Sequence, residues 1–188
     1  MPLTKIKSLG ITDGTVLAAD IADGSITAAK LASGVGTGKF ESALLHVRDE
    51  KASGTSAGDF NSGSWRTRTL NTSLTNEISG ASLSSNQIIL PSGTYFIMAT
   101  TPAFLVASHK AKLRNITDSS DTLIGTSEYC DGNITTSSFV FGRFTIASQK
   151  TFELQHRCSN TKAGNGFGQN SDFTVTEVYA NVLIWKVA

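Results

Sequence analysis

The first part of the chain carries aliphatic side chains at intervals of five residues. They fall at Ile6, Ile11, Val16, Ile21, Ile26 and Leu31. On one α-helix a step of five residues rotates the side chain by about 140°, and on one strand it changes face at every step. Because neither regular element collects these side chains on one side, the spacing predicts a chain that changes conformation within each repeat.

The residues between the aliphatic positions agree with that prediction. Residues 11–16 (ITDGTV) return ten positions later as the similar 21–26 (IADGSI). Each Asp-Gly pair favours a turn, because glycine tolerates positive φ and aspartate bonds its own backbone. The Ala-Ala pairs at 18–19 and 28–29 then permit a short helical turn.

One aliphatic side chain in five cannot form a core within a single chain. We therefore expect three copies to lie side by side, with each ring of aliphatic side chains packed about a shared axis. The alternative is an Ala- and Gly-rich linker without fixed structure. Residues 33–38 (SGVGTG) predict a hinge. The chain is thus divided into a stalk and attachment segment, 1–38, and a head domain, 39–188.

From Lys39 onward the pattern changes to short apolar segments separated by turn sequences such as Pro91-Ser92-Gly93. No segment has a long apolar period of 3.6 residues. Eight or nine strands with this spacing favour an all-β, two-sheet sandwich of the jelly-roll type. The predicted strands cover 43–48, 64–71, 86–90, 94–101, 105–117, 121–129, 138–147, 150–158 and 173–187.

Several of these strands are apolar on both faces. In the last strand Val178, Ala180, Val182 and Ile184 alternate with a second apolar set, Tyr179, Leu183, Trp185 and Val187. A sandwich exposes one face of each sheet, so an apolar outer face calls for a cover, which a closed homotrimer would provide. The alternative is ordinary variation in which side chains face outward. The predicted head contacts of the trimer are Tyr179, Leu183 and Trp185.

Composition and charge restrict the partners. The chain has 188 residues and a net charge of +1, which gives no general attraction to nucleic acid or anionic lipid. It has no run of 18 apolar residues, so we expect no membrane insertion, and its N-terminus lacks the apolar stretch of a secretory signal. Two cysteines, Cys130 and Cys158, are too few for a disulfide scaffold. They are two free thiols or one bridge between neighbouring strand ends.

The long loop 159–170 is the main candidate for recognition. It combines amide side chains, one cation and one aromatic ring with several glycines. Amides can bond sugar hydroxyls while an aromatic ring covers the apolar side of the sugar. The alternative is a solubilising loop, or one packed at the trimer contact. The receptor-binding candidates are Lys162, Asn165, Phe167, Gln169 and Asn170.

No pattern in the chain indicates catalysis, a cofactor or a metal. The histidines, His46, His109 and His156, lie in predicted strands without metal-ligand spacing. Residues 118–121 (DSSD) predict a β-turn, because the ligand spacing of a calcium loop is missing. We therefore predict that the protein is not an enzyme and has neither a cofactor nor a metal site.

The phrase at 21–31 (IADGSITAAKL) resembles a repeat near the N-termini of bacteriophage tail-fibre and other virion fibre proteins. Residues 90–95 (LPSGTY) are similar to a segment of trimeric C1q/TNF-like jelly rolls. Segments 109–118, 123–129, 152–158 and 177–179 resemble the heads of phage fibres with that fold.

The resemblance implies a non-enzymatic, trimeric virion component that is made in the cytoplasm of the host bacterium. Residues 1–38 would bind other virion proteins, and the head would adhere to the host surface, with a cell-surface glycan as the candidate receptor. A capsid or baseplate decoration or connecting protein without receptor binding is the alternative.

Overall fold

The computed structural model describes residues 17–22, 25 and 43–187. Two units are distinguished, Met1–Phe40 and Glu41–Ala188. In the first, η2 (Ala18–Asp20) is a 3-10 turn in which Asp20 N–H donates to Leu17 O at 2.9 Å. This confirms the helical turn predicted at 18–19. Ile21 is 41% exposed in the single chain. The predicted boundary at 38/39 lies outside the described residues. So do the other predicted stalk residues, which are Ile6, Ile11, Val16, Ile26 and Leu31.

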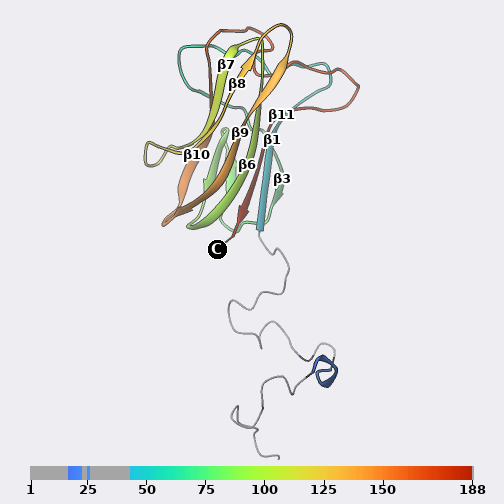
Figure 1. Cartoon of the computed structure of the whole chain (residues 1–188), viewed down its shortest axis with the longest axis vertical. Coiled ribbons are helices and arrows are strands. Elements are labelled where there is room, and N and C mark those ends of the chain that lie inside the picture. Colours follow the sequence, from blue (N-terminus) through green and yellow to red (C-terminus); the bar gives the residue numbers. More distant parts are fainter. Residues whose placement is uncertain (1–16, 23–24, 26–42, 188) are drawn as a thin grey trace, which may run out of the picture. The chain divides into compact units, whose positions relative to one another are not determined.

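The second unit is a sandwich of two antiparallel sheets (Figure 1). The five-stranded sheet has the order β3-β1-β11-β6-β9, with strands Thr72–Asn76, Ala43–Lys51, Glu177–Lys186, Gly93–Phe104 and Thr135–Ile146. The six-stranded sheet has the order β4-β5-β10-β7-β8, with strands Ser82–Ser84, Gln87–Leu90, Lys150–Cys158, Ala107–Asn115 and Ser120–Cys130. Its sixth strand, β2 (Arg66–Thr67), pairs with β10.

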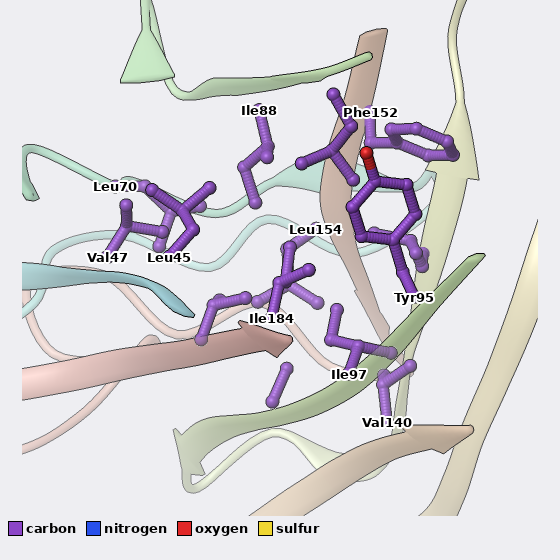
Figure 2. Packing of buried hydrophobic residues seen from close by; sticks show 14 of the residues in the cluster. Leu45, Val47, Leu70, Ile88, Tyr95, Ile97, Val140, Phe152, Leu154 and Ile184 are labelled. Atoms are coloured by element: carbon purple, nitrogen blue, oxygen red, sulfur yellow. The ribbon is translucent and has the colours of Figure 1, made fainter. Parts of the chain in front are cut away.

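The core follows from the period-two alternation of apolar residues. Tyr95 and Ile97 of β6 are fully buried, whereas Phe96 and Met98 between and after them are 39% and 42% exposed. Successive side chains of a strand point to opposite faces, so one set from each sheet fills the space between the layers. Figure 2 shows side chains of this apolar cluster, among them Leu45, Val47, Ile88, Val140, Phe152, Leu154 and Ile184.

Two predicted strands are wrong in part. Of 64–71, only Arg66–Thr67 forms a strand, and Thr72–Asn76 pairs with β1 instead. The last strand begins at Glu177 rather than at 173. A register shift between Arg48 and Glu50 places two residues of β11, Tyr179 and Ala180, opposite one residue of β1. Such a bulge reverses the alternation, so both are buried and Val178 is 42% exposed.

The sandwich has one end rich in loops. Ala43 pairs with Lys186, so β1 begins and β11 ends at the same edge of the body. The loops 52–65 and 159–176 lie at the opposite end, together with the turns between β6 and β7 and between β8 and β9 (Figure 1). We call this the loop end. It holds all five predicted receptor-binding residues.

Candidate functional site

The two long loops of the loop end are bonded to each other through their backbones. Phe60 N–H donates to Lys162 O at 2.9 Å, and Lys162 N–H donates to Phe60 O at 3.0 Å. Phe167 N–H donates to Gly58 O at 3.2 Å. Because these bonds bridge residues about a hundred positions apart, the loop 159–170 is a fixed part of the fold despite its several glycines.

The structure brings the predicted receptor-binding residues together, but their polar groups largely satisfy one another. Asn165 Nδ2 donates to Gln169 Oε1, and Gln169 Nε2 donates to Asn170 Oδ1 at 2.6 Å. Asn170 Oδ1 also accepts from Ser56 Oγ at 2.8 Å. The Lys162 ammonium lies 6.0 Å from the centre of the Phe104 ring. This amide network stabilises the loop, and it leaves few of the groups free for a sugar.

Phe167 cannot serve as an open aromatic platform. Its ring stacks on Phe60 with 4.3 Å between ring centres, and the Arg68 guanidinium carbon lies 4.2 Å from the centre of the same ring. With these two groups against it, the ring anchors the loop to the cluster of Phe60, Ala103, Val106, Cys130 and Cys158. The structure therefore does not support its predicted role in stacking on a receptor sugar.

Tyr179 is likewise removed from the predicted contact between copies. Its side chain is 6% exposed, and its hydroxyl donates to Thr55 O at 2.8 Å. A Cβ built on Gly168 would lie 2.4 Å from the Tyr179 ring, so only glycine permits this approach. The bulge of β11 turns Tyr179 under the chain's own loops, away from the face that Leu183 and Trp185 share.

Arg68 is the group that ties the loop end to the sheets. It is fully buried, and its Nη1 and Nη2 donate to Pro102 O at 3.1 Å and to Phe167 O at 3.0 Å. Burial lowers the pKa of Arg68 to about 9, and the charge of Asp49 partly opposes this shift. The guanidinium therefore remains charged at neutral pH, inside the protein.

Two histidines that the sequence placed in separate strands form a buried chain. His109 Nδ1 lies 2.9 Å from His156 Nε2, and His109 Nε2 lies 2.7 Å from Thr136 Oγ1. The Thr136 hydroxyl donates to Tyr129 O, so it accepts from His109 Nε2–H. In a neutral His109, Nδ1 then accepts from His156 Nε2–H. One of these two ring nitrogens must be an acceptor, so at most one of the two rings can be charged.

The electrostatics of the loop end agree with neutral rings. Burial lowers the pKa of His109 to about 4, and burial with the nearby charge of Arg68 lowers the pKa of His156 well below its usual value. Burial raises the pKa of the Cys158 thiol to about 11. A thiolate paired with an imidazolium, the form needed for cysteine nucleophiles, is therefore disfavoured at neutral pH.

Both cysteines are free and buried in the same cluster. Cys130 ends β8 and Cys158 ends β10, and β7 lies between these two strands. Two strand spacings separate the Cα atoms by roughly 9–10 Å, beyond the roughly 7 Å that a disulfide can span. The structure thus favours the first of the two predicted states, free thiols.

The remaining polar candidates have structural partners. His46 lies on β1, away from the other two histidines, and its Nε2 is 2.7 Å from Asn181 Oδ1. The turn predicted at 118–121 lies two residues earlier, at 116–119, and Ser120 and Asp121 already belong to β8. Asp118 N–H donates to Asn115 Oδ1 at 3.0 Å within this turn. Within the described residues no group of three or more His, Cys, Asp or Glu side chains could hold a metal ion. The described part of the chain also contains no helix of the length and apolarity needed to cross a bilayer.

The five-stranded sheet carries an apolar outer face that runs across four strands. Leu183, Met98 and Phe141 are paired in one row, and Leu44, Trp185 and Phe96 are paired in the next. Phe141 is 47% exposed, and its ring stacks on Phe139 at 5.5 Å. The apolar outer face is defined as Leu44, Phe96, Met98, Phe139, Phe141, Leu183 and Trp185. Of the predicted head contacts, Leu183 and Trp185 belong to it.

The six-stranded sheet carries a different feature, an open pocket of about 520 Å³. It is lined by residues 108–110 of β7, 127–129 of β8, 157–159 at the end of β10, and Trp65. Sequence analysis missed this pocket, because its parts come from four separate segments. The available clue was the polar outward row of β7, in which Ser108, Lys110, Lys112 and Arg114 alternate with buried residues.

The sequence matches no protein-family model and no curated protein. The structure is similar to the globular domain of zebrafish complement 1qA protein, with a TM-score of 0.51, 11% identity, and coverage of 79% of this chain and 98% of that chain. It is also similar to murine APRIL at pH 5.0, with a TM-score of 0.52, 7% identity, and coverage of 77% and 99%. At these identities the likeness concerns the fold. It confirms the predicted all-β jelly roll of the C1q/TNF-like kind.

Proposed function

We propose that this protein is a structural virion fibre protein of a bacteriophage, a homotrimer that is anchored by residues 1–38 and presents the head for adhesion to a host-surface glycan. The protein would be made in the cytoplasm of the host bacterium and reside in the virion, without enzymatic activity. The repeat at 11–31, with its five-residue aliphatic spacing, supports the fibre role. Ile21 and Leu17, 41% and 63% exposed in the single chain, would be covered by partner copies.

The apolar outer face is the observation that carries the trimer. Met98 and Phe141 are register partners, 42% and 47% exposed, and they continue a row that starts at Leu183. A contiguous apolar surface of several large side chains is uncommon on a monomer and is typical of an interface. A closed threefold contact between copies would remove this surface from water.

A charge on that face should break the trimer. We expect Met98→Glu to convert the full chain from trimer to monomer at micromolar concentration, because the carboxylate would be buried without a partner. The matched control is Ile124→Glu, since Ile124 is 57% exposed on the six-stranded sheet. Light scattering reports the mass. Equal masses for the two variants would contradict the interface.

Adhesion is tested separately from assembly. Fluorescently labelled full chain should bind host cells, and removal of surface polysaccharide should abolish that binding. When residues 1–38 are deleted, the truncated protein should no longer be found on purified phage particles. If the trimer binds no host surface but still sits on the particle, the protein is a capsid or baseplate connecting piece instead.

A further inference from the structure

The pocket on the six-stranded sheet contains two cations that form no ion pair with the described residues. Lys110 of β7 and Arg157 of β10 are direct register partners on the outer face. Directly opposed side chains have their Cβ atoms about 5 Å apart, and like charges in that position are destabilising. Neither residue forms an ion pair with any described residue. An anion held between them would relieve the repulsion.

The neighbouring cations of the same strand show the usual arrangement. Lys112 and Arg114 continue the outward row of β7 and both reach Asp121, at 2.8 Å and 2.9 Å. The next position along, Lys110, has a serine, Ser127, as its partner on β8. Glu128 also lines the pocket, but it forms no ion pair with Lys110 or Arg157 within the described residues. The pocket therefore holds two cations and one carboxylate with neither cation in an ion pair, whereas Lys112 and Arg114 are both paired.

The other lining groups suit a sugar ring. Trp65 and Tyr129 provide aromatic surface, and Tyr129 is 60% exposed. The Lys112 ammonium lies 4.1 Å from the Trp65 ring centre, which holds the indole in place. Hydroxyls of Ser108, Ser127 and Ser159 line the same pocket. Aromatic faces cover the apolar side of a sugar, whereas hydroxyls and carboxylates bond its hydroxyl groups.

We propose that this pocket binds an acidic sugar, a pyranose that carries a carboxylate, with Arg157 and Lys110 on the carboxylate and Trp65 or Tyr129 on the ring. A neutral sugar would leave the two cations opposed, and a small inorganic anion would leave the aromatic groups without a role. A single-stranded nucleic acid requires a cationic track along its backbone, and here the cations beyond the pocket are paired with Asp121. The proposal deepens the adhesion function proposed above and depends on it for its biological role.

The chain has two tryptophans, and only Trp65 of these lines the pocket. Full-length chain labelled with 5-fluorotryptophan therefore contains its own reference in Trp185, on the other sheet. We expect D-glucuronate or D-galacturonate to shift the Trp65 fluorine resonance to saturation and to leave Trp185 unmoved. D-Glucose and D-galactose differ from these uronates only by a hydroxymethyl group in place of the carboxylate. They should bind at least tenfold more weakly than the uronates.

Three substitutions distinguish uronate binding in the pocket from a general effect of positive surface charge. Arg157→Gln and Lys110→Gln should each weaken uronate binding at least fivefold. Arg114→Gln removes the same charge from the outer face of β7 and should leave binding unchanged. Without sugar, Arg157→Gln should unfold at the same temperature as the native chain or a higher one, because a repulsion has been removed. A merely structural arginine would instead lower that temperature.

The proposal would be overturned by no Trp65 shift with either uronate, by equal binding of the neutral sugars, or by an equal loss of binding in Arg114→Gln. A short oligothymidylate that shifts Trp65 at lower concentration than the uronates would assign the pocket to nucleic acid and would overturn it too. If the chain is a trimer but binds no uronate, only the proposal for the pocket is contradicted. If the chain is a monomer but binds uronate, the fibre proposal is contradicted and the proposal for the pocket stands.

Discussion

The cluster between the sheets and the cluster at the loop end are both closed to water, but they are built from different groups. Between the sheets, aliphatic and aromatic side chains such as Phe152 and Leu154 fill the space. At the loop end, Arg68, His109 and His156 are buried as well. Arg68 lies against the Phe167 ring, His156 against the Phe60 ring, and His109 is bonded to His156. The first cluster is stabilised by removal of apolar surface from water, and the second depends on polar groups that must find partners.

The difference shows what each region can tolerate. Apolar packing has no directional requirement, so the apolar cluster should lose stability in proportion to the volume removed. The loop-end cluster holds two long loops through a few specific bonds, so a single substitution there should loosen the loops before it unfolds the sheets. Three experiments test this contrast, and the loss of stability that we expect decreases from the first to the third.

Truncation in the apolar cluster should have the largest effect. Phe152 is fully buried, and its ring lies 5.4 Å from that of Phe144. We expect Phe152→Ala to lower the free energy of unfolding by about 3–5 kcal/mol, because it removes a buried aromatic side chain and leaves a cavity. Urea unfolding at fixed protein concentration measures the change. A loss below about 1 kcal/mol would contradict the central role given to this cluster.

Removal of the buried arginine should have a smaller and more local effect. We expect Arg68→Ala to cost about 2–3 kcal/mol, since the carbonyls of Pro102 and Phe167 lose their buried donors. Hydrogen exchange should accelerate at the amides of Phe60 and Phe167 far more than at Ile97, in the middle of β6. Equal acceleration at all three amides would show that the loop end is not a separate cooperative unit.

Acidification should affect the loop end at a higher pH than the apolar cluster. The pKa of His109 is about 4 in the folded chain and close to 6.5 when unfolded, so the unfolded state takes up the proton first. The stability that neutral His109 provides is complete above pH 6.5 and is lost as the pH falls toward 4, by about 2 kcal/mol between pH 7 and pH 5. The lowered pKa of His156 likewise makes the folded chain less stable as the pH falls. Burial raises the pKa of Asp49, so protonation of Asp49 instead makes the folded chain more stable as the pH falls.

The comparison of His109→Gln with the native chain isolates this contribution. Between pH 7 and pH 5 the free energy of unfolding should fall less steeply in the variant. Asp118, Asp121, Glu153 and Glu177, whose pKa values are lowered, lose their stabilising effect only below that interval. Parallel slopes for the two chains would show that His109 is not held neutral by the fold.

The same contrast explains what the sequence could predict. Alternation along the predicted strand 94–101 places Tyr95 and Ile97 on one face and Phe96 and Met98 on the other, because period-two patterning is local in the chain. Both pairs are apolar, so only the fold decides that Tyr95 and Ile97 point inward. The two bonds from Arg68 reach residues 34 and 99 positions away, and no local pattern reports them. For that reason 64–71 was predicted as a regular strand. The bulge that buries Tyr179 likewise depends on its pairing with β1.

The candidate site was predicted with less success for the same physical reason. The composition of 159–170 identified a polar loop that does lie at the loop end, but its amides and the Phe167 ring are occupied by neighbours. The pocket depends on Lys110 and Arg157, which become neighbours only through the pairing of β7 with β10. Strand registry of this kind is set by the fold as a whole.

We propose that two further copies of the chain cover the apolar outer face of the five-stranded sheet, which includes Met98 on β6 and Phe141 on the edge strand β9. Sedimentation equilibrium of the full-length protein at micromolar concentration tests this claim most directly. We expect a single species with three times the mass of one chain. A stable, soluble species with the mass of one chain would contradict it.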